Sequence, residues 1–253
     1  MYTRTAASGA LVAAAFIALL SGCSSPSSDA AAPSSGPAVD GSGSNSSGAS
    51  FCPNPHGGSC LGPLTAGEYR TTTFEPQIDY TVPDGWTNFE DLPGNFWLFQ
   101  QQDSQESARG GSYLGIYSNI HAAAIDCREA WQDGVGITPT ELVDWYQSVP
   151  GLIVSEPLPV TVGGLEGLQV DLSLEPGVAT CSFDGNVGIP LIIGDGVSDL
   201  HHVILHDLDV RLVLLEWGDG NVTLEITNAV AQHSPEEFRS QLQPVIDSLV
   251  FQQ

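Results

Sequence analysis

A short apolar run that ends in Leu20-Ser21-Gly22-Cys23 limits which part of this chain can belong to a folded domain. The run from Ala10 to Leu20 has eleven residues, whereas a membrane-spanning helix needs about twenty. This arrangement is typical of a lipobox, in which the cysteine receives a lipid and everything before it is removed. We therefore predict a signal peptide over 1–22 and a lipidated Cys23 that holds the chain on the outer face of a cell membrane. An ordinary secretory signal is the alternative.

The residues after Cys23 predict a flexible linker followed by one domain. Between 24 and 50, 23 of the 27 residues are Ser, Ala, Gly or Pro. Such a composition cannot bury enough apolar surface to offset the entropy lost on folding. The lipidated cysteine and the linker together cover 23–50. Residues 51–253 show no composition break or internal repeat, so we predict a single disulfide-bonded domain of ordinary size.

Four cysteines remain for the domain once the lipobox cysteine carries a lipid, and outside the cytoplasm they are expected to oxidise. Of the three possible connectivities we favour Cys52–Cys60 with Cys127–Cys181. The first pair lies only eight positions apart, and the Pro and Gly residues between them can turn the chain back. The second pair follows by elimination. A zinc site that uses Cys and His56 is the alternative, but the sequence lacks the paired CxxC spacing of such sites.

Acidic residues dominate the charge of the chain, which combines 30 Asp plus Glu with 6 Arg and no Lys. The formal net charge is −24, and it becomes −25 when removal of 1–22 takes one Arg and no acidic residue. Nucleic acids and anionic lipid headgroups both require a cationic protein surface, so we predict neither as a direct partner. The expected partners are the membrane, through the lipid on Cys23, and an unknown protein or small-molecule ligand.

Strand patterns dominate the predicted domain. Three runs, His201–His206, Val210–Trp217 and Val222–Thr227, are separated by short turns and predict an antiparallel meander. Gly163-Gly164 predicts a two-residue hairpin turn. The other expected strands are Glu68–Phe74, Ile78–Val82, Asn95–Gln101, Ser112–Ser118, Leu158–Val162 and Leu165–Ser173.

Two helices are expected from their capping signals. In Thr138-Pro139-Thr140-Glu141, the threonine can cap, proline suits the first helical position, and the glutamate can return a hydrogen bond. Pro150 ends this helix. Ser234-Pro235-Glu236-Glu237 repeats the pattern before apolar residues at helical spacing. Pro244 predicts that the second helix is kinked or broken near Gln243.

No motif of a known catalytic mechanism is present. The sequence has no Gly-x-Ser-x-Gly elbow, no His-Glu-x-x-His helix and no phosphate-binding loop. We therefore predict no catalytic residue, no metal ligand and no cofactor. His202 and His206 would lie about 13 Å apart along a strand, too far to share a metal ion, so surface or hydrogen-bonded histidines are the better interpretation. The acidic stretches at 184–186 and 195–199 do not fit the EF-hand spacing for calcium.

Five aromatic residues crowd the stretch around Pro93-Gly94. Three of them, Trp86, Phe89 and Trp97, are candidates for a ligand-binding groove, because Asn88–Asn95 is expected to be a loop that would expose them. Packing in the core of the first sheet is the more frequent explanation for such a cluster. The turn before Trp86 is expected to fold this side chain onto the core.

Two segments carry a resemblance to a known family. Tyr80-Thr-Val-Pro-Asp-Gly-Trp86 resembles the start of PsbP-like domains. Phe238 through Val245-Ile-Asp-Ser-Leu-Val-Phe251 is similar to their C-terminal helix and short terminal strand. Actinobacterial surface lipoproteins of the LpqN type share that architecture. The four domain cysteines and the segment Asp126–Ile189 depart from the pattern.

The resemblance implies an α+β fold, with an antiparallel β-sheet and two main helices packed on it. It brings no catalytic residues, and family members act mainly as accessory or binding proteins. The leading hypothesis is therefore a non-enzymatic cell-surface lipoprotein that binds a partner protein or small ligand in a concave, partly apolar site. One alternative is a carboxylate-based cell-envelope hydrolase, with or without calcium. A purely structural interaction module is another.

Overall fold

The computed structural model describes residues 50–51, 62–100, 112–178, 181–183, 186–194, 202–229 and 234–252. They belong to one compact unit, 46–253. The predicted signal peptide, the predicted lipidation of Cys23 and the predicted Cys52–Cys60 disulfide lie outside the described residues, as do the acidic stretches at 184–185 and 195–199. Within the described residues, no helix has the length and apolar character that crossing a membrane requires.

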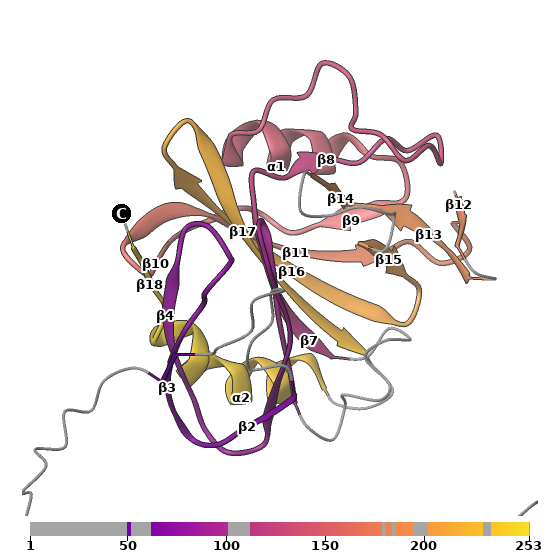
Figure 1. Ribbon diagram of the computed structural model, residues 1–253. Helices are drawn as coiled ribbons and strands as arrows, with labels where there is room; N and C mark the ends of the chain where they lie inside the picture. Colours follow the sequence, from indigo (N-terminus) through magenta and orange to yellow (C-terminus); the bar gives the residue numbers. More distant parts are fainter. Residues whose placement is uncertain are drawn as a thin grey trace, which may run out of the picture. The chain divides into compact units, whose positions relative to one another are not determined.

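A nine-stranded sheet forms the centre of this unit, and each neighbouring pair of its strands is antiparallel (Figure 1). A short strand, β9, extends one edge by pairing with β11. In spatial order the strands are β10 (Leu158–Val162), β11 (Leu165–Leu174), β16 (Leu208–Trp217), β17 (Gly220–Ala229), β7 (Tyr113–Ser118), β6 (Asn95–Gln100), β5 (Trp86–Leu92) and β2 (Gly62–Leu64), with β9 at Leu152–Val154.

Three smaller sheets accompany the central one. The first joins segments far apart in the sequence, because β18 pairs with β4 near the other end of the domain. Its order is β1 (Ser50–Phe51), β3 (Gly67–Arg70), β4 (Ile78–Val82) and β18 (Val250–Phe251), with β1 parallel to β3. The second contains β12 (Cys181–Phe183), β13 (Asn186–Pro190) and β15 (Val203–Leu205), and the third contains β14 (Ile192–Ile193) and β8 (His121–Ala122).

The predicted hairpin at Gly163-Gly164 is confirmed, but of the predicted three-stranded meander only the pair formed by its last two runs is present. β10 and β11 join through Gly163-Gly164, both with positive φ (59° and 86°), and β16 pairs with β17 from Leu208 to Trp217. The first meander run contributes β15, which pairs with β13 rather than with β16. β16 already has β17 on one edge and β11 on the other, so both of its edges are occupied.

Both predicted helices are present, and their starts follow the capping signals. Thr138 and Glu141 form the capping box of α1 (Pro139–Ser148), where Glu141 N donates to Thr138 Oγ1 at 3.3 Å. Ser234 caps α2 (Pro235–Asp247), because its Oγ accepts a hydrogen bond from Glu237 N at 3.2 Å. Of the kink or break predicted near Gln243, the break is wrong, because α2 continues through Pro244 to Asp247; the kink stays a prediction.

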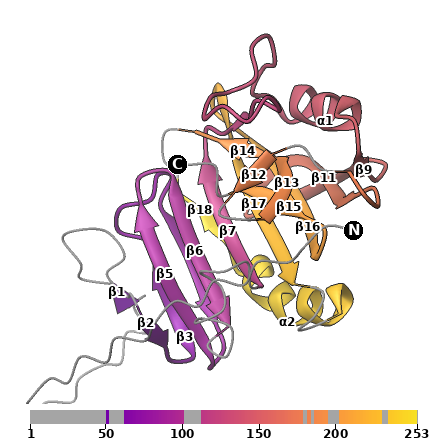
Figure 2. The same ribbon diagram turned by 90° about the vertical axis from the view of Figure 1, so that its right-hand side faces the viewer.

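Two hydrophobic cores occupy opposite faces of the central sheet. Side chains alternate between faces along a strand, so Val213 and Leu215 of β16 join one core while Leu212 and Leu214 join the other. The first core contains apolar residues of α2 and of the β3–β4–β18 sheet, and the second contains those of α1. Figures 1 and 2 show the two helices apart, with strands of the central sheet between them. The prediction of a mainly antiparallel sheet with two helices is confirmed, although strands dominate.

A buried carboxylate attaches the segment after β3 to the central sheet. Asp91 of β5 is 1% exposed. Its Oδ2 accepts hydrogen bonds from Thr72 N (2.7 Å) and Thr72 Oγ1 (2.9 Å), and its Oδ1 accepts from Thr73 N (3.2 Å) and Phe74 N (2.8 Å). Charge-assisted bonds of this kind are stronger than neutral ones. Asp91 therefore holds 72–74, and with them the chain leading to Pro76, against β5.

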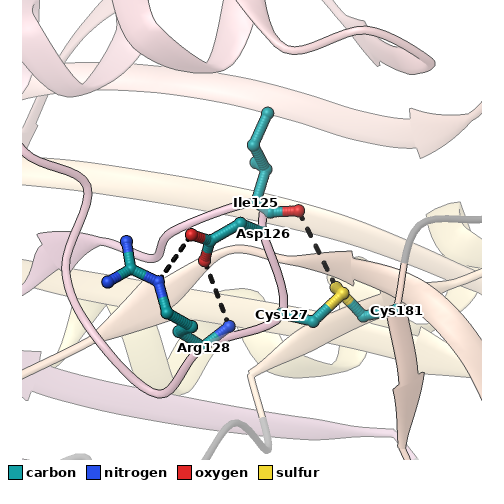
Figure 3. The surroundings of a disulfide bond; sticks show 5 residues. All are labelled: Ile125, Asp126, Cys127, Arg128 and Cys181. Atoms are coloured by element: carbon teal, nitrogen blue, oxygen red, sulfur yellow. Dashed lines mark hydrogen bonds and ion pairs between the residues drawn. A yellow bond between two sulfur atoms is a disulfide. The ribbon is translucent and has the colours of Figure 1, made fainter.

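The predicted disulfide between Cys127 and Cys181 is confirmed (Figure 3). The two Cα atoms lie 5.3 Å apart, within the range that disulfides span. The bond joins the loop after β8 to β12. Beside it, Arg128 Nε donates to Asp126 Oδ2 at 2.5 Å, and this bond lowers the pKa of the exposed Asp126. The disulfide thus joins the loop to β12, and the exposed Asp126–Arg128 ion pair lies within the loop itself.

Candidate functional site

The predicted aromatic groove is divided between the two faces of the sheet. Asn88–Asn95 is not a loop, because β5 and β6 form a hairpin there. Trp86 is buried in the core that contains α2, as the turn before it predicts. Phe89 and Trp97 stack on each other, with ring centroids 6.0 Å apart, and Trp97 packs against the opposite core. The structure therefore brings Phe89 and Trp97 together and separates them from Trp86.

A β-bulge at Phe89 contributes to this cluster. The register of the β5–β6 pair shifts there, which leaves Phe89 without an opposite residue, and bulges re-aim a side chain in this way. Phe89 is 39% exposed and also packs edge-on against Phe99. Trp97 stacks on Tyr113 with centroids 5.2 Å apart and meets His202 edge-on. The rings of this aromatic cluster thus pack against one another, and Phe89 is its exposed member.

His202 connects this aromatic cluster to a buried carboxylate, Glu225 of β17. Its side chain is 2% exposed, and that of His202 is fully buried. Glu225 Oε2 accepts hydrogen bonds from His202 Nδ1 (2.8 Å) and Tyr117 Oη (2.9 Å). Burial acts to raise the pKa of Glu225, but the attraction of His202 and these hydrogen bonds outweigh it and lower the pKa. Burial also raises the pKa of Tyr117 well above its ordinary value, which keeps this hydroxyl a donor.

The histidines follow the expectation of hydrogen-bonded side chains, but they do not share a strand face. They flank β15, and the exposed His206 meets the backbone oxygen of Val178 at 2.6 Å. His202 is buried rather than on the sheet surface. Within the described residues, no group of three or more His, Cys, Asp or Glu is placed to hold a metal ion. Glu225, His202 and Tyr117 are buried and hydrogen-bonded to one another. We therefore assign these three side chains a role in the stability of the core.

A cavity between α2 and strands β10, β11, β16 and β17 of the central sheet is the best candidate for a functional site. Its volume is about 450 Å³, within the range of small-molecule sites. One wall is apolar, with Val160, Val162, Val213, Ile226 and Ile246. The polar lining consists of Gln169, Arg211, Arg239, Gln243 and Asp247, together with Thr161. The cavity is concave and partly apolar, which matches the kind of site expected from the sequence.

Two arginines of the cavity are held by carboxylates that do not line it. Arg211 Nε and Nη2 donate to Asp171 Oδ1 (2.7 Å) and Oδ2 (2.9 Å), a bidentate pair across β11 and β16. Arg239 Nη2 of α2 donates to Asp209 Oδ1, and it lies 3.3 Å from Asp171 Oδ1. Each guanidinium has more N–H groups than these bonds use. The carboxylates thus fix the positions of the two guanidinium groups, and their other N–H groups remain as donors for a ligand.

The two carboxylates respond differently to this environment. Burial acts to raise the pKa of Asp171, but the hydrogen bond and charge of Arg211 outweigh it, so the pKa is lowered. For Asp209 the burial prevails over Arg239, and the pKa is raised. Acid and base catalysts also show such opposite shifts. Here, however, both carboxylates bind guanidinium groups, which is a positioning arrangement rather than an acid/base pair facing a substrate.

Sequence reasoning did not single out the polar residues of the cavity. The available signal was a charge inside an otherwise apolar strand: Arg211 stands between Val210 and Leu212, and Asp171 between Val170 and Leu172. Charged residues are rarely placed in such runs unless they are paired. That Asp171 lies opposite Arg211, however, follows from the pairing of β11 with β16 and not from either segment alone.

No protein-family model and no curated protein matches this chain. Among solved structures, LpqN of Mycobacterium tuberculosis, a protein involved in cell envelope biogenesis, is 12% identical over 76% of this chain and 90% of its own, with a TM-score of 0.35. The cyanobacterial PsbP (CyanoP) of Synechocystis is 14% identical over 77% of this chain and 98% of its own, also with a TM-score of 0.35.

A protein from Bacteroides thetaiotaomicron is 11% identical over 70% of this chain, with a TM-score of 0.35. This chain covers 45% of that protein, less than half its length. At these TM-scores the three likenesses establish neither a shared fold nor a shared activity, so the functional argument is based on the residues of this chain.

Proposed function

We propose that this chain is a lipid-anchored extracytoplasmic protein that binds a small ligand without transforming it. The PsbP-like, actinobacterial assignment and the anchoring through Cys23 remain predictions from the sequence. The binding role is supported by one observation above all, the cavity beside α2. Arg211 and Arg239 line it with their positions fixed by Asp171 and Asp209. Preset donors beside an apolar wall suit recognition of a ligand that carries acceptor oxygens and an apolar part.

The ligand-binding proposal is tested by blocking the cavity. Gln243 lines it from the exposed side of α2, so Gln243→Trp fills the space without disturbing the core. Ser240→Trp places the same side chain on an exposed position of α2 that does not line the cavity. The full chain is isolated from its producing cells, and native mass spectrometry measures any co-purified mass. We expect that mass on the parent chain and on S240W but not on Q243W.

A second experiment tests the role of the arginines. Arg211→Lys keeps the charge but removes the bidentate fork to Asp171. We expect the co-purified ligand to bind about tenfold more weakly to R211K, a difference of about 1.4 kcal/mol. Equal ligand occupancy in parent, Q243W and R211K would show that the cavity is not the binding site.

The lipid anchor is tested independently of the cavity. The parent chain and Cys23→Ser are expressed with a labelled palmitate, and the membrane fraction is collected. We expect label and membrane association for the parent and their loss for C23S. Association of unlabelled C23S with the membrane would contradict the anchoring proposal while leaving the ligand-binding proposal in place.

One observation favours the hydrolase as a second candidate. A cavity of about 440 Å³ at the N-terminal end of α1 contains both Glu166 of β11 and Glu216 of β16. Each lies one residue beyond Gly167–Leu215, the last register pair of β11 and β16. Were that register to continue, they would be opposite each other, about 5 Å apart at Cβ. Retaining glycosidases place their carboxyl groups at a similar separation. Both glutamates are exposed, whereas a general acid is normally kept protonated by burial.

Release of reducing ends from cell-wall glycans distinguishes the two functions. The binding proposal expects no release by the parent chain. Release that is lost in both Glu166→Gln and Glu216→Gln would establish the hydrolase instead. Release that persists in both variants would identify a contaminating activity.

A further inference from the structure

We propose a second ligand site, for an organic cation, in a cavity that the proposed function does not use. It has a volume of about 490 Å³ and is lined by Glu75, Pro76, Pro93, Gly94, Ser118, Asn119 and Trp217. None of these residues lines the cavity beside α2. The site therefore stands or falls separately from the proposed binding function.

Its walls are fixed by contacts between four segments. The β5–β6 turn is tied to the end of β7, because Ser118 N donates to Gly94 O at 3.2 Å. Asn119 has a left-handed backbone (φ 53°), and its N donates to Asn221 O at 2.8 Å. Asp91 holds the segment that leads to Glu75 through three backbone N–H groups. The cavity is thus preformed, which lowers the entropy cost of binding.

The chemistry of the lining selects the ligand class. Trp217 supplies an aromatic surface and is itself packed against the core, while Pro76 and Pro93 supply apolar rings. Glu75 supplies an exposed carboxylate, and no lining residue carries a positive charge. An indole together with a carboxylate attracts an ammonium or guanidinium group through cation–π and Coulomb interactions.

Two other ligand classes fit this lining less well. An anion would meet Glu75 and a chain of net charge −24, without a compensating cation in the lining. A divalent metal ion takes six or more oxygen ligands, several of them carboxylates, and this cavity has one carboxylate. The charge of the chain favours the approach of cations, and the apolar rings favour a cation on an apolar stem.

Two sources could supply such a cation, a small quaternary ammonium compound or an Arg or Lys side chain of a polypeptide. Choline and acetyl-arginine methylamide are therefore titrated separately into the full chain. The neutral probe 3,3-dimethylbutanol has the shape of choline without its charge. Binding is followed by calorimetry at low salt, where charge interactions are least screened. We expect saturable binding of at least one cation and about tenfold weaker binding of the neutral probe.

Matched variants locate the site. Glu75→Gln removes the lining carboxylate from an exposed position, so folding is preserved. Asp219→Asn removes an exposed carboxylate two positions from Trp217 that lines none of the three cavities. We expect about tenfold weaker cation binding for E75Q and less than about twofold change for D219N. Trp217→Leu, checked for folding by circular dichroism, is expected to weaken binding to a similar extent.

Three results would overturn the proposal. The first is the absence of saturable binding of both cations below about 100 mM. The second is equal weakening in E75Q and D219N, which would indicate attraction to the general negative charge. The third is equal binding of choline and its neutral isostere, which would indicate a purely apolar cavity.

Discussion

Replacing Asp91 by Asn tests whether the segment after β3 is held by the buried carboxylate. The substitution keeps the volume but turns one acceptor oxygen into an NH₂ donor. If nitrogen replaces Oδ2, Thr72 N loses its acceptor; if it replaces Oδ1, both Thr73 N and Phe74 N lose theirs. One stranded buried N–H costs about 1–3 kcal/mol. The remaining bonds also lose the assistance of the charge, about 1 kcal/mol each.

We therefore expect Asp91→Asn to lower the free energy of unfolding by at least about 3 kcal/mol. For a domain of this size, that corresponds to a fall in Tm of about 6–12 °C. Urea unfolding followed by tryptophan fluorescence measures the change directly. The control is Asp84→Asn, because Asp84 is exposed and accepts one backbone bond, from Ala66 N at 2.8 Å. We expect this control to lose less than about 0.5 kcal/mol, and an equally small loss for D91N would refute the reasoning.

Three further predictions concern other parts of the fold. Replacing Cys127 and Cys181 together by Ser should cost about 4 kcal/mol in urea unfolding, because the disulfide closes a 54-residue separation; an unchanged midpoint would contradict this. Glu225 has a lowered pKa, so its stabilising effect is present above about pH 4.5 and is lost as pH falls through its folded-state pKa. Glu225→Gln should lose about 3–5 kcal/mol at pH 7, and its deficit relative to the parent should shrink in acid; a constant deficit would count against this assignment. Gly163→Ala should cost more than about 1 kcal/mol, because a Cβ there would lie 2.5 Å from the Phe251 ring at a φ of 59°; thermal unfolding at the parent's Tm would show that the turn relaxes.

Features set by neighbouring residues could be predicted from the sequence. The start of α1 depends on Thr138 and Glu141, three positions apart, and the β10–β11 hairpin depends on its two glycines. The Cys127–Cys181 disulfide could be predicted because only four domain cysteines had to be paired. In each case the information lies in a short segment or in a small number of possible pairings.

Choices between distant partners could not be predicted. The residues before β16 have strand character, but nothing local shows that β15 pairs with β13. The cavity beside α2 combines Val160, Arg211 and Arg239 from separate elements, so its existence depends on the order of strands in the sheet. The sequence indicates Phe89 and Trp97 as aromatic candidates together with Trp86. Their separation from Trp86 follows from side-chain alternation in the β5–β6 hairpin, where the sequence predicts a loop.

The pairing of β18 with β4 has a consequence for how the chain folds. Residues 78–79 pair with 250–251, and Gln252 N donates to Gln77 O at 2.8 Å. Ser248 also bonds to Thr81 through its hydroxyl. During synthesis, β4 therefore cannot pair with β18 until residues about 170 positions later have been made. Loop closure over such a separation slows folding. Completion of this sheet thus depends on the encounter of 78–79 with 250–251 rather than on local helix or hairpin formation.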